Sequence, residues 1–323
     1  MPFKSFVGKR IISVVPGKAT RLEFTVALEG PFSLEYTLES GQAFRWENRG
    51  EWWYGVVPGG VLKVRQDAES LRCVSSSDSI NSSFVSSYFR LDDDLAEVLE
   101  SIDRDEVIRE AIERFYGMRL IRQDTWECLA SFSLATNANI PRITKMIDSV
   151  CRALGAATEF EGSAYRLFPT ADAIRKSSLR SLRNLRLGYR APFLKRIAEN
   201  VAASGKLELS SLTSLPYEEA RRILVSRTKG RKLLLGVGPK VADCVLLFSA
   251  EKDDAFPIDV WVARVLVQRY PTLLRPATRS RIMKGRGRLS AADYSAASSA
   301  ARNYFGRHAG YAQQYLYMLS KTA

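Results

Sequence analysis

The chain has 323 residues, enough for two or three packed units, and its 46% hydrophobic and 26% charged content is typical of a globular protein in water. The 48 Lys and Arg residues exceed the 35 Asp and Glu residues by a net charge of +13, which indicates a polyanionic partner, nucleic acid ahead of a membrane surface. No apolar run approaches the roughly 18 residues of a membrane span, and the N-terminal apolar stretch is too short for a secretory signal, so we expect an intracellular protein without membrane association.

Residues 21–74 are predicted to form β-strands. RLEFTVALEG and FSLEYTLESG alternate apolar and polar residues, and WWYGVV and VLKVR flank a Pro-Gly-Gly turn. The Ser-rich stretch over residues 75–87 is predicted to be a loop or a domain joint. We therefore expect an N-terminal antiparallel β domain over residues 1–90.

From about Asp92 onward the apolar residues recur at helical spacing. LAEVLESI, VIREAIERFYGM, ITKMIDSVCRAL and YEEARRILV each show this period, and helices continue through DVWVARVLVQRY and YAQQYLYMLS to the C-terminus. The chain has no repeat of fixed period. The predicted fold class is α+β, an antiparallel β domain followed by a helical domain over residues 91–323.

The cysteines and the single histidine disfavour several kinds of site. Because the cysteines are scattered without a C-x-x-C pair, we expect neither zinc nor an iron–sulfur cluster, and no cofactor. His308 lies next to glycine in a segment typical of turns, so a Ser/His/Asp triad would depend on that one residue. A conventional hydrolase or metalloenzyme is therefore disfavoured.

The stretch GVGPKVADC, residues 236–244, predicts a tight hairpin that leads into a helix. Pro239 suits the first helical position, so Lys240 lies in the first turn, where the helix dipole disfavours a cation by roughly 0.3–1 kcal/mol. Backbone N–H groups of such a hairpin point outward and can hold a phosphate without reading base sequence. The segment before it adds basic residues for the same purpose: Arg222, Arg227, Lys229, Arg231 and Lys232.

The residues alone leave two interpretations of Lys240 open. It is either a solvated first-turn lysine or an amine whose dipole setting and partial burial favour the neutral, nucleophilic form, which can form a Schiff base. Cys244 lies four residues later on the same helix face. Asp259 precedes another apolar helix, where it can cap the helix and also stabilise a cationic sugar transition state.

The order of short motifs resembles that of the 8-oxoguanine DNA glycosylases of the eukaryotic type, in the helix-hairpin-helix superfamily. SGQAFRW, YFRLD, MRLIRQDTWECLASF, TNANIPRIT, LRLGYRA, GVGPKVADC, PIDVW and AGYAQQYLY follow the family order over roughly residues 33–320. The resemblance implies a two-lobed helical domain with the helix-hairpin-helix motif at about residues 218–250. It also implies a bifunctional DNA glycosylase and AP lyase of base excision repair, which excises 8-oxoguanine preferentially opposite cytosine. Lys240 would attack C1′, and Asp259 would stabilise the sugar cation.

The resemblance also assigns a pocket for the base, which must leave the duplex stack before excision. Gln313 would bond the edge of the extruded base, while Tyr317 and Cys244 would sandwich its ring. The carbonyl of Gly41 would accept N7–H, a donor that 8-oxoguanine has and guanine lacks. Without the resemblance, Gln313 and Tyr317 would be interpreted as ordinary packing residues on one helix face.

The remaining family positions concern the opposite strand and the DNA backbone. Asn137, Arg142 and Arg190 match residues that face the orphaned cytosine, and Tyr189 matches the wedge that holds the duplex open. Four positions match the family's phosphate contacts, namely Gly236, Gly238, Val241 and Trp261.

The chain departs from the family pattern at several positions. Trp261 stands where the family commonly has a histidine near phosphate, and Tyr317 stands where a phenylalanine is usual. Ala138 and Pro141 differ from the commoner residues of their motif, and the basic segment before the hairpin is longer than usual.

Two alternatives remain at this stage. One is a glycosylase of the same superfamily for another damaged base; adenine-specific members usually lack the lysine and carry an iron–sulfur loop. The other is a non-catalytic helix-hairpin-helix module, which would explain the charge but not Lys240, Asp259 and the Gln313 face together. The expected partner is double-stranded DNA containing 8-oxoguanine, bound by a monomer in the cytoplasm or nucleoid of a prokaryote or in a eukaryotic nucleus.

Overall fold

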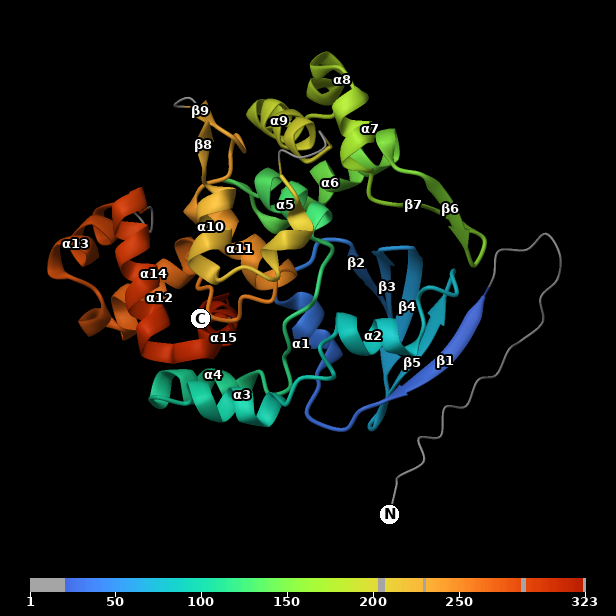
Figure 1. Ribbon diagram of the computed structural model, residues 1–323. Helices are drawn as coiled ribbons and strands as arrows, with labels where there is room; N and C mark the ends of the chain where they lie inside the picture. Colours follow the sequence, from blue (N-terminus) through green and yellow to red (C-terminus); the bar gives the residue numbers. More distant parts are fainter. Residues whose placement is uncertain (1–20, 203–206, 229–230, 286–288, 322–323) are drawn as a thin grey trace.

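The computed structural model describes residues 21–202, 207–228, 231–285 and 289–321. A five-stranded antiparallel sheet lies beside two groups of helices, and the C-terminal helix lies between these parts (Figure 1). The predicted α+β class with an N-terminal antiparallel sheet is therefore confirmed. In this part of the chain no helix is long and apolar enough to cross a membrane, and no cluster of His, Cys, Asp and Glu could hold a metal ion.

The sheet has the strand order β1-β5-β4-β3-β2, so the first and last strands in the sequence pair with each other. The predicted Pro-Gly-Gly hairpin is present, with Val57 paired to Gly60. Apolar side chains of one face, among them Leu62 and Val64, are fully buried under the helices that follow the strands. The strands are β1 (Leu22–Ala27), β2 (Trp46–Arg49), β3 (Trp52–Val57), β4 (Gly60–Gln66) and β5 (Ser70–Ser75).

The stretch FSLEYTLESG forms helix α1 (Leu34–Glu39), so the strand predicted there is wrong. Its apolar residues fit an alternating pattern, but Leu34 and Leu38 also lie four apart on one helix face, and both are buried. Ser33 favours the helix over the strand, because its side chain accepts a hydrogen bond from the amide of Tyr36 at 3.2 Å and caps the helix.

The Ser-rich stretch is only partly a loop. Helix α2 (Ser82–Tyr88) begins inside it, because Asn81 caps the amide of Phe84 at 3.1 Å and Val85 is buried against the sheet. The prediction of a loop over residues 75–87 is therefore wrong for its second half.

The helices form two groups, which meet in Figure 1 where α5 lies beside α10 and α11. The upper group holds α5 (Thr125–Leu134), α6 (Ile140–Leu154), α7 (Ala171–Lys176), α8 (Leu179–Asn184) and α9 (Ala191–Ala202). The other group holds α3 (Leu95–Ile102), α4 (Glu106–Arg114), α10 (Tyr217–Leu224), α11 (Pro239–Ser249), α12 (Val260–Arg269), α13 (Pro276–Lys284), α14 (Ala291–Phe305) and α15 (Ala309–Lys321).

A second hairpin interrupts the helical part, where only helices are predicted. Strands β6 (Ala157–Phe160) and β7 (Ser163–Arg166) pair beside the sheet, and Phe160 is buried against Val61 and Val74. The two strands have only 4 residues each, the shortest length at which an alternating pattern can be recognised, and Gly162 in their turn has a φ of 74°.

Helix α11 joins the two helical groups. The ring of Phe248 on α11 stacks on that of Phe132 on α5, with 5.5 Å between their centroids. One continuous apolar core runs through both groups. The start of α11, which carries GVGPK, therefore lies on a rigid support between the two groups.

Candidate active site

The hairpin before α11 requires glycine at one position in particular. Gly236 has a φ of 85°, and a Cβ atom added to it would lie 2.4 Å from the ring of Phe193 on α9. Gly238 caps α11 without a side chain, so no side-chain cap occupies the first amides of the helix. These N–H groups, including that of Val241, suit an anion such as a DNA phosphate.

We expect Gly236→Ala to lower both thermal stability and DNA affinity. The new methyl group must displace Phe193, and the left-handed backbone adds strain of roughly 1–3 kcal/mol. The measurement is the melting temperature together with the dissociation constant for a DNA duplex. Gly162→Ala is the matched control, because Gly162 has a similar φ of 74° with nothing within 4 Å of an added Cβ. Equal affinity losses in both variants would contradict a specific role of the hairpin.

The basic segment before the hairpin is only partly described. Strands β8 (Arg227–Thr228) and β9 (Arg231–Lys232) pair as a short antiparallel ladder. Lys229 lies outside the described residues, and so do the side chains of Arg227, Arg231 and Lys232. The phosphate contacts predicted for them remain a prediction.

Lys240 lies in the first turn of α11, as the sequence predicts, and its side chain is half-buried. Its Nζ atom is 5.2 Å from the ring centroid of Phe132, a cation–π distance. It hydrogen bonds the thiol of Cys244 one turn later, and the charge of Asp259 acts on it. The structure therefore brings Lys240, Cys244 and Asp259 together around one amine.

Of the two interpretations of Lys240, the neutral amine is not the form that its surroundings favour in the free protein. Burial disfavours its ammonium, but the hydrogen bond to Cys244 and the negative charge of Asp259 oppose burial, and the pKa of Lys240 is raised above its ordinary value. Burial also raises the pKa of Cys244 to about 11, so Cys244 is a thiol at neutral pH. Lys240 is consequently an ammonium in the free protein, with the Phe132 ring at a cation–π distance and the charge of Asp259 acting on it.

Asp259 caps α12, as predicted. Its Oδ1 atom accepts hydrogen bonds from the amides of Trp261 at 2.9 Å and Val262 at 2.8 Å. The cap fixes the carboxylate at the start of the helix, where the dipole favours negative charge. The charge of the same carboxylate also acts on Lys240, so the cap and an electrostatic role on the sugar are compatible.

Three chain segments meet at the candidate base pocket. A Cβ atom on Gly41, whose φ is 74°, would lie 3.0 Å from the hydroxyl of Tyr317 and 3.4 Å from Ile140. Burial, together with the charge of Asp259, raises the pKa of Tyr317 to about 12. Gly41, Tyr317 and Asp259 therefore border one region, and Ile140 lines it without having been predicted.

Gln313 lies one turn before Tyr317 on α15 and is 4% exposed. Its Oε1 atom is buried and has no hydrogen-bond partner among the described residues. A buried acceptor without a partner costs roughly 1–3 kcal/mol, so such atoms are rare unless a ligand satisfies them. Gln313 thus offers an acceptor that the protein itself leaves open.

The predicted opposite-strand residues gather where α5 ends and α6 begins. Asn137 has a φ of 52°, and its Nδ2 atom donates to the hydroxyl of Tyr189 at 3.3 Å. Arg190 is buried and donates from Nη2 to the carbonyl of Asn137 at 3.0 Å and from Nε to that of Thr136 at 3.0 Å. Arg142 is exposed in the first turn of α6.

Tyr189 projects from this cluster with 49% of its surface exposed. Its hydroxyl donates to the carbonyl of Thr136 at 3.0 Å, and its ring lies under the guanidinium of Arg190 at 4.4 Å. An exposed ring held by its own hydroxyl and by a cation is suited to act as a wedge. Arg190 holds the loop around Asn137 in the free protein, a contact that the sequence did not predict.

Trp261 is also exposed, at 42% of its surface, next to Val260 at 41%. The guanidinium of Arg264 lies 5.0 Å from its ring centroid. Where the family resemblance implies a histidine near phosphate, the chain thus has an indole with a cation on its face. Arg264 supplies the positive charge that Trp261 lacks.

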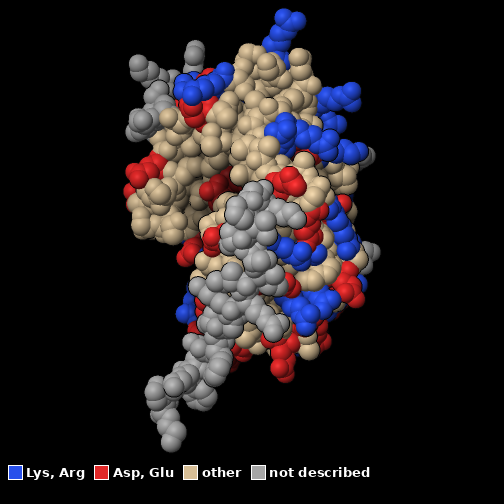
Figure 2. Space-filling view, turned by 90° about the vertical axis from the view of Figure 1, so that its right-hand side faces the viewer, with Lys and Arg blue, Asp and Glu red and all other residues tan. Residues whose placement is uncertain are grey.

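Positively charged side chains also lie on α7 and α8, the helices that precede Tyr189. Lys and Arg side chains gather on the upper part of the face in Figure 2, at the height of α7 and α8 in Figure 1. The exposed residues there are Arg175, Lys176, Arg180 and Arg183. Asp172 pairs with the first two, which leaves α8 with unbalanced positive charge on the segment that leads to Tyr189.

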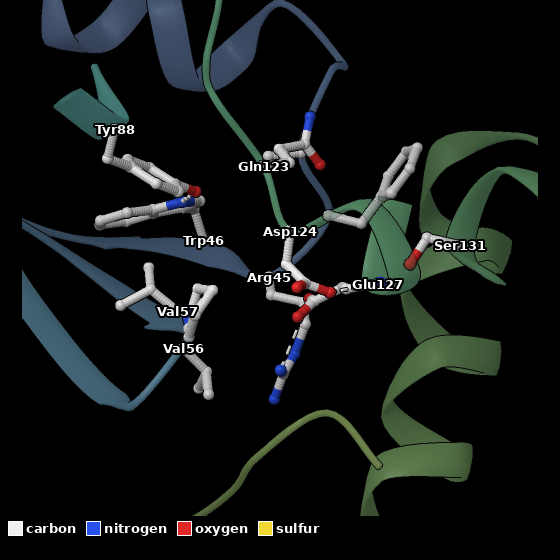
Figure 3. A pocket seen from close by; sticks show the side chains of 12 residues that line it. Arg45, Trp46, Val56, Val57, Tyr88, Gln123, Asp124, Glu127 and Ser131 are labelled. Atoms are coloured by element: carbon white, nitrogen blue, oxygen red, sulfur yellow. Dashed lines mark hydrogen bonds and ion pairs between the residues drawn. The ribbon is translucent and has the colours of Figure 1, made fainter. Parts of the chain in front are cut away.

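A small pocket at the junction of the sheet and α5 is a different kind of feature (Figure 3). Its volume is about 20 Å³, enough for one water molecule but far below that of a nucleobase. Arg45 and Glu127 point toward each other across it at 3.5 Å, and burial raises the pKa of Glu127 to about 7. We therefore regard it as part of the domain junction.

Comparison with known proteins finds chains that are similar to this one. Residues 25–129 match the family of the 8-oxoguanine DNA glycosylase N-terminal domain. The N-glycosylase/DNA lyase OGG1 of Arabidopsis thaliana is 30% identical over 319 residues, which are 95% of this chain and 80% of the relative.

Solved structures share the whole architecture. That of MBOgg1 in complex with a low affinity DNA ligand has a TM-score of 0.79 at 32% identity and covers 96% of this chain and 98% of the other. The Clostridium acetobutylicum 8-oxoguanine glycosylase/lyase, in complex with dsDNA containing cytosine opposite 8-oxoG, has a TM-score of 0.78 at 28% identity and covers 90% and 92%.

The fold and the site together define a DNA glycosylase of the helix-hairpin-helix class. Within that class, the chain belongs to the 8-oxoguanine DNA glycosylase family of N-glycosylase/DNA lyases.

Proposed function

We propose that this chain is a bifunctional 8-oxoguanine DNA glycosylase and AP lyase that acts on double-stranded DNA. The observation that supports this substrate is the buried Oε1 atom of Gln313, which has no hydrogen-bond partner among the described residues. A guanine-type base presents N–H donors on its Watson–Crick edge, which can satisfy this acceptor. The homologues named N-glycosylase/DNA lyase support the two activities.

The remaining pocket residues act on the two faces of the base and on its N7 position. Tyr317 and Cys244 sandwich the ring, and the Gly41 carbonyl accepts the N7–H of 8-oxoguanine. The short distance of 3.0 Å between the Tyr317 hydroxyl and a Cβ atom placed on Gly41 supports a pocket that closes tightly around that edge. The role of each residue is part of the proposal.

The chemistry begins when Lys240 loses its proton and its neutral amine attacks C1′ of the damaged nucleoside. The glycosidic bond breaks, its electron pair leaves with the base, and the base takes up a proton. Asp259 stabilises the positive charge that develops on the sugar. Opening of the sugar gives a Schiff base on Lys240, and removal of a C2′ proton then breaks the C3′–O bond by β-elimination.

DNA contacts outside the pocket position the lesion. The amides at Gly236, Gly238 and Val241 hold phosphates at the start of α11, and Arg264 over Trp261 adds a contact at the start of α12. Tyr189 fills the space that the extruded base leaves. In a cell the protein acts on the genome, in the nucleoid or in the nucleus.

Borohydride trapping on duplexes with 8-oxoguanine opposite each of the four bases tests this function. A lysine-type enzyme becomes covalently linked to the lesion strand, whereas a binding module does not. A glycosylase for another base would trap only on its own lesion. Absence of a covalent adduct on every 8-oxoguanine duplex would overturn the proposal.

We expect preferential excision opposite cytosine. Cytosine has an N4 donor and, once its partner has left, exposed O2 and N3 acceptors. The guanidinium groups of Arg142 and Arg190 can donate to these acceptors, and the amide oxygen of Asn137 can accept from N4. Another base in that place leaves buried donors unpaired at roughly 1–3 kcal/mol each. Arg142→Ala should therefore reduce the preference more than it weakens overall binding. Single-turnover excision opposite each base measures this.

Arg152→Ala provides the control for this variant. Arg152 is an exposed arginine in the last turn of the same helix α6, where it pairs with Asp148 at 2.9 Å. It should leave the preference unchanged. Equal excision opposite all four bases by the unmodified protein would contradict recognition of cytosine.

A further inference from the structure

One face of α14 holds the chain segment that leads to Asp259. Tyr294, Ser298 and Arg302 are spaced four residues apart and therefore lie on one side of the helix. The Tyr294 hydroxyl accepts a hydrogen bond from the amide of Ile258 at 3.2 Å. The Ser298 hydroxyl donates one to the carbonyl of Phe256 at 3.2 Å. The Arg302 guanidinium donates to the Asp254 carbonyl at 3.0 Å.

These three contacts fall on alternate residues of one extended segment. Residues 254, 256 and 258 are each bonded through the backbone, and the third is the residue before Asp259. Ile258 itself is 3% exposed, so its amide has no access to solvent as a substitute partner. The segment has no regular secondary structure of its own, and the side chains of α14 bond it at these three residues.

Tyr294 also forms a hydrogen bond to α11, the helix that carries Lys240. The Tyr294 hydroxyl donates to Oδ2 of Asp243 on α11 at 2.7 Å. Asp243 is fully buried. Its Oδ1 atom accepts hydrogen bonds from the Tyr217 hydroxyl at 2.9 Å and from Nε of Arg221 at 2.8 Å. Asp243 lies three residues after Lys240 and directly before Cys244, on the helix whose first turn carries the amine.

We propose that Tyr294 is a positioning residue that fixes the carboxylate of Asp259 relative to the amine of Lys240. A single hydroxyl connects the two helices that present the reacting pair, because it donates to Asp243 on one and accepts the amide before Asp259 on the other. The phenol is 5% exposed, and its hydroxyl bonds Asp243 and the amide of Ile258. It sets the separation of two groups whose distance decides the rate.

The chain offers a matched comparison for this role. Tyr217 donates to the same buried carboxylate through the same kind of hydroxyl, but it lies on α10 and its hydroxyl bonds only Asp243 among the described contacts. Tyr294→Phe and Tyr217→Phe each remove one donor from Asp243 and keep the ring. Only Tyr294→Phe also releases the amide before Asp259.

The experiment measures single-turnover base release from an 8-oxoguanine duplex, the dissociation constant for a duplex with a stable abasic-site analogue, and the melting temperature. Misplacement by about 1 Å of a catalytic group costs on the order of 100-fold in rate, so Tyr294→Phe should slow base release by at least about tenfold with an unchanged dissociation constant. Tyr217→Phe should lower the melting temperature similarly and keep base release within about twofold.

Equal rate losses in the two phenylalanine variants would overturn the inference, since Tyr294 would then act only through Asp243. If Tyr294→Phe does not fold, Ser298→Ala replaces it, because it removes a bond to the same segment and leaves Asp243 untouched. A rate unchanged in that variant would equally overturn the inference. The inference rests on the proposed function, whose failure would differ, because the unmodified protein would then release no base.

Discussion

Replacing Lys240 with glutamine should abolish base release and borohydride trapping while leaving affinity for lesion DNA nearly unchanged. Glutamine has a similar length and no nucleophilic amine, so no Schiff base can form. Binding should survive, because the phosphate contacts that we propose come from the amides of the hairpin and α11, and from arginines elsewhere. Excision on an 8-oxoguanine:cytosine duplex, trapping and the dissociation constant are to be measured on one preparation.

Lys63→Gln is the control for the loss of one positive charge. Lys63 lies on the sheet, where its Nζ atom pairs with Glu161 at 3.0 Å, far from α11 in the fold (Figure 1). Its variant should release 8-oxoguanine at the unmodified rate. Release of the base by the Lys240 variant at a comparable rate would show that another group performs the attack.

The positions of Lys240 and Asp259 could be predicted because both depend on local signals. Pro239 after a Gly-x-Gly turn starts one helix, and an aspartate before an apolar run starts the other. Ser33 carries the same kind of signal at α1, but the alternation around it also fits a strand. The spacing of the apolar residues alone did not distinguish a helix from a strand, whereas the helix cap at Ser33 does.

The electrostatics of Lys240 could not be predicted in the same way. The helix dipole and burial, which can be inferred from the sequence, favour a neutral amine. The groups that reverse this come from elsewhere: the Phe132 ring lies on α5, and Asp259 lies at the start of α12. Contacts between distant segments depend on packing, for which a single sequence contains no spacing rule.

The segment before Asp259 illustrates the same limit. The four-residue spacing of Tyr294, Ser298 and Arg302 is visible in the sequence, but small residues between them suggest only a packed helix. What α14 packs against becomes known from the fold. The open acceptor on Gln313 likewise became visible only once its surroundings were known.

Asp259 should have two separable functions. Asp259→Asn keeps an oxygen that can accept hydrogen bonds from the amides of Trp261 and Val262, but it removes the negative charge that we propose stabilises the sugar cation. We therefore expect base release to fall by on the order of 100-fold or more with little loss of stability. Asp259→Ala removes the cap as well and should lose about 1 kcal/mol of unfolding free energy in addition.

Denaturant unfolding and single-turnover excision, measured on both variants, separate these functions. Asp94→Asn is the control, since Asp94 caps α3 by accepting the amide of Glu97 at 3.1 Å and lies on a helix without a predicted site residue. It should affect neither quantity. If the asparagine variant of Asp259 excised 8-oxoguanine as fast as the unmodified protein, the carboxylate would be a helix cap alone. The developing sugar cation would then have to be stabilised by another group, and the negative charge that acts on Lys240 would serve only to hold its ammonium in the free protein.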